Sequence, residues 1–99
     1  MKVKLVNRGE EGELVLEGRL DSVTSPEVEK IFNQTAERFG SVVLNMGGVE
    51  YVSSAGLRII KLLYMAMTKK GGSLTLTNVR KMVMEVFEMT GFVGLLTIK

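Results

Sequence analysis

The sequence of 99 residues contains no cysteine and no histidine, and each absence excludes a kind of chemistry. Without cysteine there is neither a disulfide nor a thiol nucleophile, which fits a protein of the cytoplasm. Without histidine there is no Ser–His or Cys–His pair to activate a nucleophile, and the commonest metal ligand is missing. We therefore expect a protein that is not an enzyme and that carries no catalytic residue, no metal and no cofactor.

An excess of one charge and long apolar runs are also missing. Thirteen basic and eleven acidic side chains give a net charge of +2, too little to argue for a nucleic-acid partner. No apolar run is long enough to span a bilayer and the first residues lack a secretory pattern, so we expect no membrane insertion. The length and the 45% hydrophobic content suit one domain comprising residues 1–99.

The hydrophobic pattern predicts an α/β fold. Apolar residues in alternating or short continuous runs predict strands near residues 3–5, 14–20, 42–44, 74–77 and 95–98. Helical spacing predicts helices between residues 24 and 40, 54 and 70, and 78 and 91. The first two strands are joined by turn residues and are expected to be antiparallel. Each later strand–helix–strand unit implies a parallel pair, so we expect a small mixed β-sheet with parallel βαβ units packed against helices.

Several polar residues are candidates for helix caps. Thr24 with Glu27 fits a capping box, whereas Ser25 with Pro26 fits a cap followed by proline at the first helical position. Asn78 can cap the third helix. We expect the central strand at residues 42–44 to be covered on both faces. The expected inner face of the third helix consists of Val79, Met82, Val83, Val86 and Phe87.

Ligands favour the sheet edge at which parallel strands reach their carboxyl ends. Three segments end there in the expected topology: residues 20–21, a loop over residues 45–53, and residues 77–78. We therefore expect the polar side chains of these segments to lie near one another, namely Asp21, Ser53, Ser54 and Asn78.

Residues 52–58 (Val-Ser-Ser-Ala-Gly-Leu-Arg) place small hydroxyl residues at the start of a strongly apolar helix. A helix start has unpaired N–H groups and partial positive charge, so Ser54 is a candidate N-cap, anion site or phosphoryl acceptor. Ser54 lies outside any G-x-S-x-G elbow, and no phosphate loop is present, which argues against hydrolase and nucleotide-binding chemistry. Gly56 fits a close approach of helix and sheet.

The least apolar face of this helix forms one stripe, comprising Ser54, Arg58, Lys61, Met65 and Lys69. A methionine among cations on an exposed stripe resembles an adaptable docking surface. The simpler alternative is that Met65 packs under a neighbouring loop.

Three segments together resemble the STAS family, whose soluble members are bacterial anti-sigma factor antagonists: residues 18–21 (Gly-Arg-Leu-Asp), 42–49 (Val-Val-Leu-Asn-Met-Gly-Gly-Val) and 52–58. The resemblance extends to the closing Thr90-Gly91-Phe92. It implies a non-enzymatic switch in which a partner that is both anti-sigma factor and serine kinase, a GHKL-type ATPase, phosphorylates Ser54. The unphosphorylated antagonist binds this partner and frees the sigma factor, and phosphorylation blocks the binding. The expected partner-binding residues are Asp21, Ser53, Ser54, Gly56, Arg58, Lys61 and Met65.

The chain departs from the family pattern at three positions. The family commonly has aspartate where this chain has Asn45 and Ser53, and often serine where this chain has Gly47. Loss of the acidic neighbour makes Ser53 an alternative phosphate acceptor. Two other functions remain open. One is a STAS subunit bound permanently to an ABC transporter ATPase; the other is a nucleotide-binding or hydrolysing domain, which the missing phosphate loop disfavours.

Overall fold

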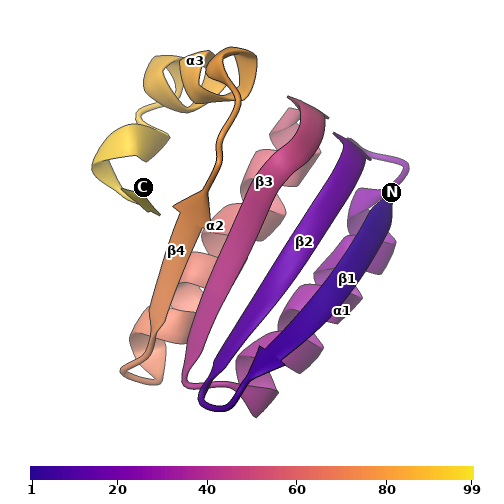
Figure 1. The fold of residues 1–99 in the computed structure, drawn as a ribbon. Coiled ribbons are helices and arrows are strands. Elements are labelled where there is room, and N and C mark those ends of the chain that lie inside the picture. The colour runs from indigo at the N-terminus through magenta and orange to yellow at the C-terminus, as the bar shows by residue number, and fades with distance from the viewer.

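Five strands form one mixed sheet in the order β1-β2-β3-β4-β5 in the computed structural model of residues 1–99 (Figure 1). The strands are β1 (Lys2–Arg8), β2 (Glu11–Leu20), β3 (Ser41–Val52), β4 (Ser73–Thr77) and β5 (Thr97–Ile98). The first two form an antiparallel hairpin, and every later pair is parallel. The predicted mixed sheet with parallel βαβ units is confirmed.

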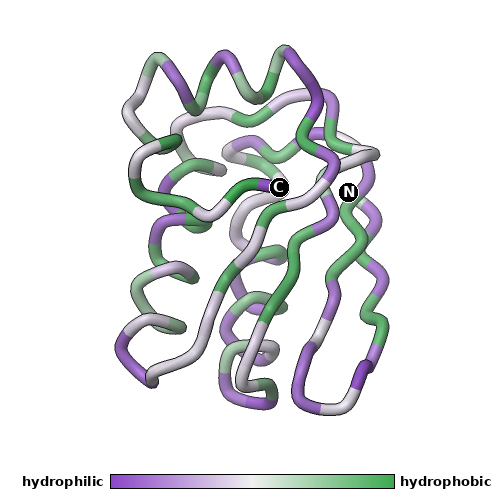
Figure 2. Tube along the Cα trace, turned by 60° about the vertical axis from the view of Figure 1, so that its left-hand side comes forward, coloured by the Kyte–Doolittle hydropathy of each residue, from purple (hydrophilic) through white to green (hydrophobic).

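Three α-helices and one short 3₁₀ helix accompany the sheet: α1 (Ser25–Arg38), α2 (Ser54–Lys69), α3 (Lys81–Met89) and η1 (Phe92–Gly94). Helices α1 and α2 lie side by side behind the sheet, whereas α3 stands beyond the end of β4 (Figure 1). Hydrophilic and hydrophobic residues alternate along α3, while the β1–β2 turn is hydrophilic (Figure 2). None of these helices combines the length and the apolar character needed to cross a membrane.

The core lies between the two long helices and one face of the sheet. Its strand residues include Leu14, Leu16, Val42, Leu44, Leu74 and Leu76, all buried. On the opposite face, Val43 and Asn45 are only half-buried. The prediction that the central strand is covered on both faces is therefore wrong. Strands β2, β3 and β4 follow one another in space as in sequence, so right-handed crossovers place α1 and α2 on the same face.

Strand β3 is much longer than its sequence indicated. The expected loop over residues 45–53 is wrong, because β3 continues to Val52 and pairs there with Leu20. Between the pairs Val15↔Asn45 and Glu17↔Gly48, β3 advances one residue more than β2, which is a bulge. A Cβ on Gly48 would lie 2.8 Å from the Leu16 carbonyl oxygen. The glycines of this segment therefore serve a bulged strand and not a turn.

The third helix differs from its prediction in two respects. Asn78 does not cap it: α3 begins at Lys81 after an N-cap residue, Arg80, that makes no side-chain capping bond. Asn78 instead adopts a left-handed conformation with φ of 55°. Met82 was expected inside but is 73% exposed, and the buried residues of α3 are Val83 and Phe87. The expected final strand is present but spans only two residues.

Candidate functional site

The start of α2 presents one serine to solvent. Ser53 is the N-cap, and its hydroxyl accepts a bond from the Gly56 N–H at 3.4 Å, while its carbonyl accepts the Leu57 N–H at 2.9 Å. Ser54 is the first helical residue, is exposed, and has a hydroxyl with no partner within the chain. The interpretation of Ser54 as a plain N-cap is wrong, because Ser53 performs that task.

Asp21 lies beside this helix start. Strand β2 ends at Leu20, which pairs with Val52, and the Ser53 N–H donates to the Leu20 carbonyl at 2.9 Å. The residue after each strand therefore meets the other at the same edge of the sheet. The sequence-based expectation that Asp21, Ser53 and Ser54 lie close together agrees with this geometry.

Gly56 holds the two segments together. It is buried, and a Cβ at this position would lie 2.7 Å from the Leu20 carbonyl oxygen and 3.0 Å from Cγ1 of Val52. Only glycine permits this approach of α2 to the ends of β2 and β3 without a shift in the backbone. Because Gly56 is buried, it supports the surface and does not itself offer a contact to a partner, contrary to our expectation.

The Asp21 carboxylate organises the turn that leads into α1. Its Oδ1 accepts the N–H groups of Val23 at 3.0 Å and Thr24 at 3.1 Å. The Thr24 hydroxyl accepts the Asp21 N–H and donates to the Arg19 carbonyl. The Thr24 side chain makes no capping bond into α1, and the Ser25 hydroxyl has no partner at all. Thr24 is thus the N-cap residue by position but without the bonds of a capping box, and Ser25, the alternative cap, is the first helical residue. Asp21 fixes the turn in place of a side-chain cap.

The same hydrogen bonds keep Asp21 ionised. The backbone N–H of Thr24, followed by that of Val23, lowers the pKa of the Asp21 carboxyl below its usual value. The Arg19 guanidinium, 3.7 Å from Asp21 Oδ2, acts in the same direction. The edge of the sheet at which β2 and β3 end therefore carries both a fixed negative charge, on Asp21, and the free hydroxyl of Ser54. No group of three or more acidic side chains is close enough together to hold a metal ion.

Asn78 belongs to a different part of the molecule. Strand β4 ends at Thr77 opposite Asn45, whereas β3 continues for seven more residues, about 20 Å of extended chain. The Asn78 side chain donates to Asn45 Oδ1 at 3.1 Å. The expectation that Asn78 joins Asp21 and Ser54 is wrong because β4 is much shorter than β3.

Asn45 is matched to its neighbours in this chain. Its Nδ2 donates to Glu13 Oε2 at 3.3 Å, and its Oδ1 accepts the Gly47 N–H at 3.1 Å. Arg8 bonds the other oxygen of Glu13 at 2.8 Å, and this bond is the main cause of the lowered Glu13 pKa. An aspartate at position 45, the residue common in the family, would set a second carboxylate against Glu13 without a proton to donate. The asparagine removes this repulsion.

The stripe on α2 is exposed as expected. Ser54, Arg58, Lys61 and Lys69 are all exposed, and Met65 is 52% exposed, so the alternative that Met65 packs under a loop is wrong. No acidic side chain pairs with Arg58 or Lys61, because both ion pairs of the chain lie elsewhere. The surface next to Ser54 therefore carries unpaired positive charge on Arg58 and Lys61, and the apolar Met65 lies between Lys61 and Lys69.

Sequence patterns missed an apolar hollow beside the same helix start. It has a volume of about 180 Å³ and is lined by Glu50, Tyr51, Val52, Met82, Val83 and Val86. The exposed ring of Tyr51 lies under the Arg19 guanidinium at 4.4 Å, which connects the hollow to Asp21. Helical spacing assigned Met82 to the core, and Tyr51 fell in an expected loop. The bulged register of β3 against β2 places Tyr51 in the strand, opposite Arg19, and the packing of α3 leaves Met82 exposed.

The sequence profile of the STAS domain matches residues 3–99, and the chain belongs to this family. A protein of Bordetella bronchiseptica (strain ATCC BAA-588 / NCTC 13252 / RB50), BtrV, is 33% identical over 81 residues. The match covers 81% of this chain and 70% of BtrV, whose name describes an anti-sigma factor antagonist. Proteins of the family are generally regulatory and not enzymatic.

Solved structures of anti-sigma factor antagonists share the fold. One from Mycobacterium paratuberculosis superposes with a TM-score of 0.88 at 19% identity, covering 98% of this chain and 83% of that one. SpoIIAA of Bacillus in its phosphorylated form superposes with a TM-score of 0.77 at 15% identity, covering 99% of this chain and 91% of that one. Unphosphorylated SpoIIAA gives 0.75, also at 15% identity, over 99% of this chain and 86% of that one. At these identities the likeness establishes a common fold.

Proposed function

We propose that this chain is an anti-sigma factor antagonist that acts in the cytoplasm as a single STAS domain. In its unphosphorylated form it binds an anti-sigma factor that is also a serine kinase, of the GHKL ATPase type. Phosphorylation of Ser54 ends the binding. The observation that carries the proposal is the exposed, unpartnered Ser54 hydroxyl at the first position of α2, at the sheet edge that also carries the ionised Asp21. The names of BtrV and SpoIIAA support the same function.

The free protein can accommodate a phosphate at this position. Phosphorylation adds about −1.5 to −2 charge, and the start of a helix favours such a charge by at most about 2 kcal/mol. Arg58 follows Ser54 by four residues on the same exposed stripe and has no acidic partner of its own. Both forms of SpoIIAA superpose on this chain almost equally, which supports a switch that leaves this fold in place.

The docked protein cannot accommodate the phosphate in the same way. In an interface the phosphate would lose its water without a matched partner for its charge. A penalty of about 3 kcal/mol lowers affinity on the order of a hundredfold. The cost of burying the phosphate at the contact therefore suffices as a switch.

The surrounding surface suits a partner with both acidic and apolar side chains. Arg58 and Lys61 are unpaired cations on the stripe, and they favour an acidic counterpart. The hollow between Tyr51 and Met82 is large enough for one apolar side chain of the partner. We include Tyr51 and Met82 in the proposed interface, together with Asp21 and the stripe.

The decisive experiment is phosphorylation by a cognate anti-sigma factor kinase with ATP, mapped by mass spectrometry. The phosphate should appear on Ser54, persist in Ser53→Ala and vanish in Ser54→Ala. Phosphate on Ser53 in the wild-type chain would transfer the role to that residue. A Ser54→Asp variant should bind the unmodified partner on the order of a hundredfold more weakly. Full-strength binding by Ser54→Asp, with co-purification of a transporter ATPase, would instead favour the transporter-subunit alternative.

A further inference from the structure

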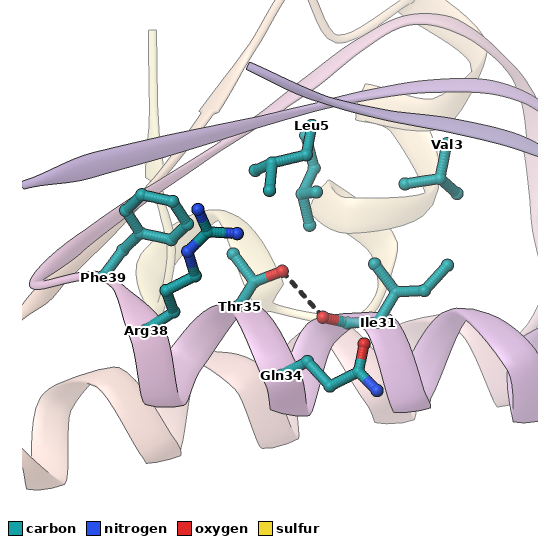
Figure 3. A pocket seen from close by; sticks show the side chains of 8 residues that line it. Val3, Leu5, Ile31, Gln34, Thr35, Arg38 and Phe39 are labelled. Carbon is teal, nitrogen blue, oxygen red and sulfur yellow. Dashed lines mark hydrogen bonds between the residues drawn. The ribbon is translucent and has the colours of Figure 1, made fainter. Parts of the chain in front are cut away.

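A groove runs between the edge strand β1 and helix α1, far along the chain from the start of α2. Its larger hollow has a volume of about 300 Å³, the lower end of the range for small-molecule sites. Figure 3 shows its lining, with Val3 and Leu5 from β1 facing Ile31 and Phe39 at the helix. A second hollow of about 220 Å³ adjoins it, because Val3 and Ile31 line both.

One charged side chain enters the larger hollow. Arg38 extends from the last turn of α1 toward β1, and its guanidinium lies 5.1 Å from the centre of the Phe39 ring (Figure 3). It forms no ion pair, and none of the side-chain hydrogen bonds involves it. The Thr35 hydroxyl nearby donates to the Ile31 carbonyl at 2.7 Å and is thus already satisfied. Gln34 is the remaining polar residue of the lining, and the other five lining residues are hydrophobic. The hollow therefore combines a mainly apolar lining with a single unpaired cation.

The carbonyl groups at the C-terminal end of α1 form no hydrogen bond with Arg38, because another residue binds them. Lys70 reaches across from α2 and donates to the carbonyls of Phe39, at 3.0 Å, and Ala36. It thereby offsets the partial negative charge that collects at a helix carboxyl end. Arg38 is left to pair with a negative charge from outside the chain.

We propose that this groove binds a medium-chain fatty acid, with the carboxylate on Arg38 and the tail along Ile31. A guanidinium pairs with a carboxylate through two parallel N–H bonds, and an unbranched hydrocarbon matches a narrow apolar lining. Arg38 and Ile31 are seven positions apart, about 10 Å of helix. An extended hydrocarbon advances about 1.25 Å per bond, so roughly nine carbons cover that length. Longer chains reach Val28 in the second hollow.

The test is calorimetric titration of the 99-residue chain with decanoate and, separately, with the uncharged 1-decanol. Decanoate should bind saturably and about tenfold more tightly than 1-decanol, because only the carboxylate forms the charge-assisted pair. Arg38→Ala should remove this preference and leave 1-decanol binding nearly unchanged. The matched control Arg58→Ala, an exposed arginine on α2, should alter neither affinity.

Equal affinity for decanoate and 1-decanol, or an Arg38→Ala variant with full preference, would overturn the proposal. So would the absence of saturable binding in the wild-type chain. A second variant, Leu5→Trp, places a large ring over the hollow from a partly exposed position and should block both ligands. Retained binding by Leu5→Trp would place the ligand elsewhere. Ser54→Asp should bind decanoate normally, so this outcome is independent of the proposed phosphorylation.

Discussion

Helices α1 and α2 both begin with a pair of hydroxyl residues, yet the two pairs have opposite environments. In α1 the pair is Thr24–Ser25, and in α2 it is Ser53–Ser54, in each case the N-cap followed by the first helical residue. The Ser25 side chain is 4% exposed and its hydroxyl has no partner, whereas the Ser54 hydroxyl is open to solvent. The same residue types thus bury a hydroxyl at the start of α1 and expose one to solvent at the start of α2.

The difference comes from what precedes and follows each pair. A turn fixed by Asp21 separates β2 from α1, and it directs Ser25 inward. Helix α2 follows β3 almost directly, and Gly56 packs on Leu20. Two residues correspond to about 200° around a helix, so the face opposite Gly56 carries Ser54. A buried glycine, and not the serine itself, therefore determines that Ser54 faces outward.

The largest effect should come from Gly56→Ala, which disturbs the close approach of α2 to the ends of β2 and β3. The new Cβ would lie 2.7 Å from the Leu20 carbonyl oxygen, so the helix or the strand end must shift. We expect the free energy of unfolding to fall by about 2 kcal/mol, because the cost of overpacking exceeds the gain in helix propensity from glycine to alanine. Denaturant unfolding measures the loss.

The matched control is Gly94→Ala. A Cβ at Gly94 meets no atom within 4 Å, and its φ lies outside the left-handed region. This variant should unfold within about 0.5 kcal/mol of the wild-type chain. If Gly56→Ala were equally harmless, close packing would not explain the position of Ser54.

The next prediction concerns how the Asp21 carboxylate, in the turn before α1, makes the free energy of unfolding depend on pH. Hydrogen bonds from Thr24 and Val23 lower the folded-state pKa of Asp21, so its contribution to stability is present above the unfolded value of about 3.9. It is lost as pH falls through the lower folded value, because protonation removes the charge. Asp21→Asn should therefore flatten the fall in stability below about pH 4, as measured by urea unfolding between about pH 2 and pH 6.

Glu13→Gln provides the comparison at a site away from both helix starts. Arg8 lowers the Glu13 pKa, so this variant should remove a separate share of the same pH dependence. The double variant with Asp21→Asn should then show the flattest profile. An unchanged slope in Asp21→Asn would mean that its carboxylate does not hold the turn in solution.

Much of the fold follows from periodicity. The alternation of Leu74 and Leu76 with threonines predicted β4, and helical spacing between residues 24 and 40 predicted α1, whose buried residues include Val28, Phe32 and Thr35. These patterns are reliable because burial of one face directly selects apolar residues at that period. The STAS resemblance of residues 52–58 likewise led to the family to which the chain belongs.

Features that depend on register and on competing hydrogen bonds were not predictable. The glycines at 47 and 48 resemble a turn locally, and only pairing with β2 makes them part of a bulged strand. Asn78 has the chemistry of a cap, but Asn45 on a neighbouring strand takes its side chain. The hollow beside Tyr51 arises from two segments, the end of β3 and helix α3, so no single stretch of sequence encodes it.

A smaller effect, of the opposite sign, is expected from Ser25→Ala. The buried Ser25 hydroxyl lacks a partner, and removing an unsatisfied buried donor relieves a cost of about 1 kcal/mol. The melting temperature should rise by about 4–8 °C for a domain of this size. Ser22→Ala, at an exposed serine in the same turn, is the control and should change little. A destabilised Ser25→Ala would show that the hydroxyl is hydrogen-bonded in solution.

The smallest effect on stability should come from Ser54→Ala. Its hydroxyl bonds nothing in the chain and alanine is the better helix former, so the free energy of unfolding should stay within about 0.5 kcal/mol of wild type. Ser53→Ala loses the 3.4 Å bond from Gly56 and should cost about 0.5–1 kcal/mol. Thermal unfolding of both variants shows which of the two substitutions destabilises the chain more. Were Ser54→Ala the more destabilising of the two, Ser54 would be the structural cap, and the exposed hydroxyl on which the proposed switch rests would be engaged within the fold.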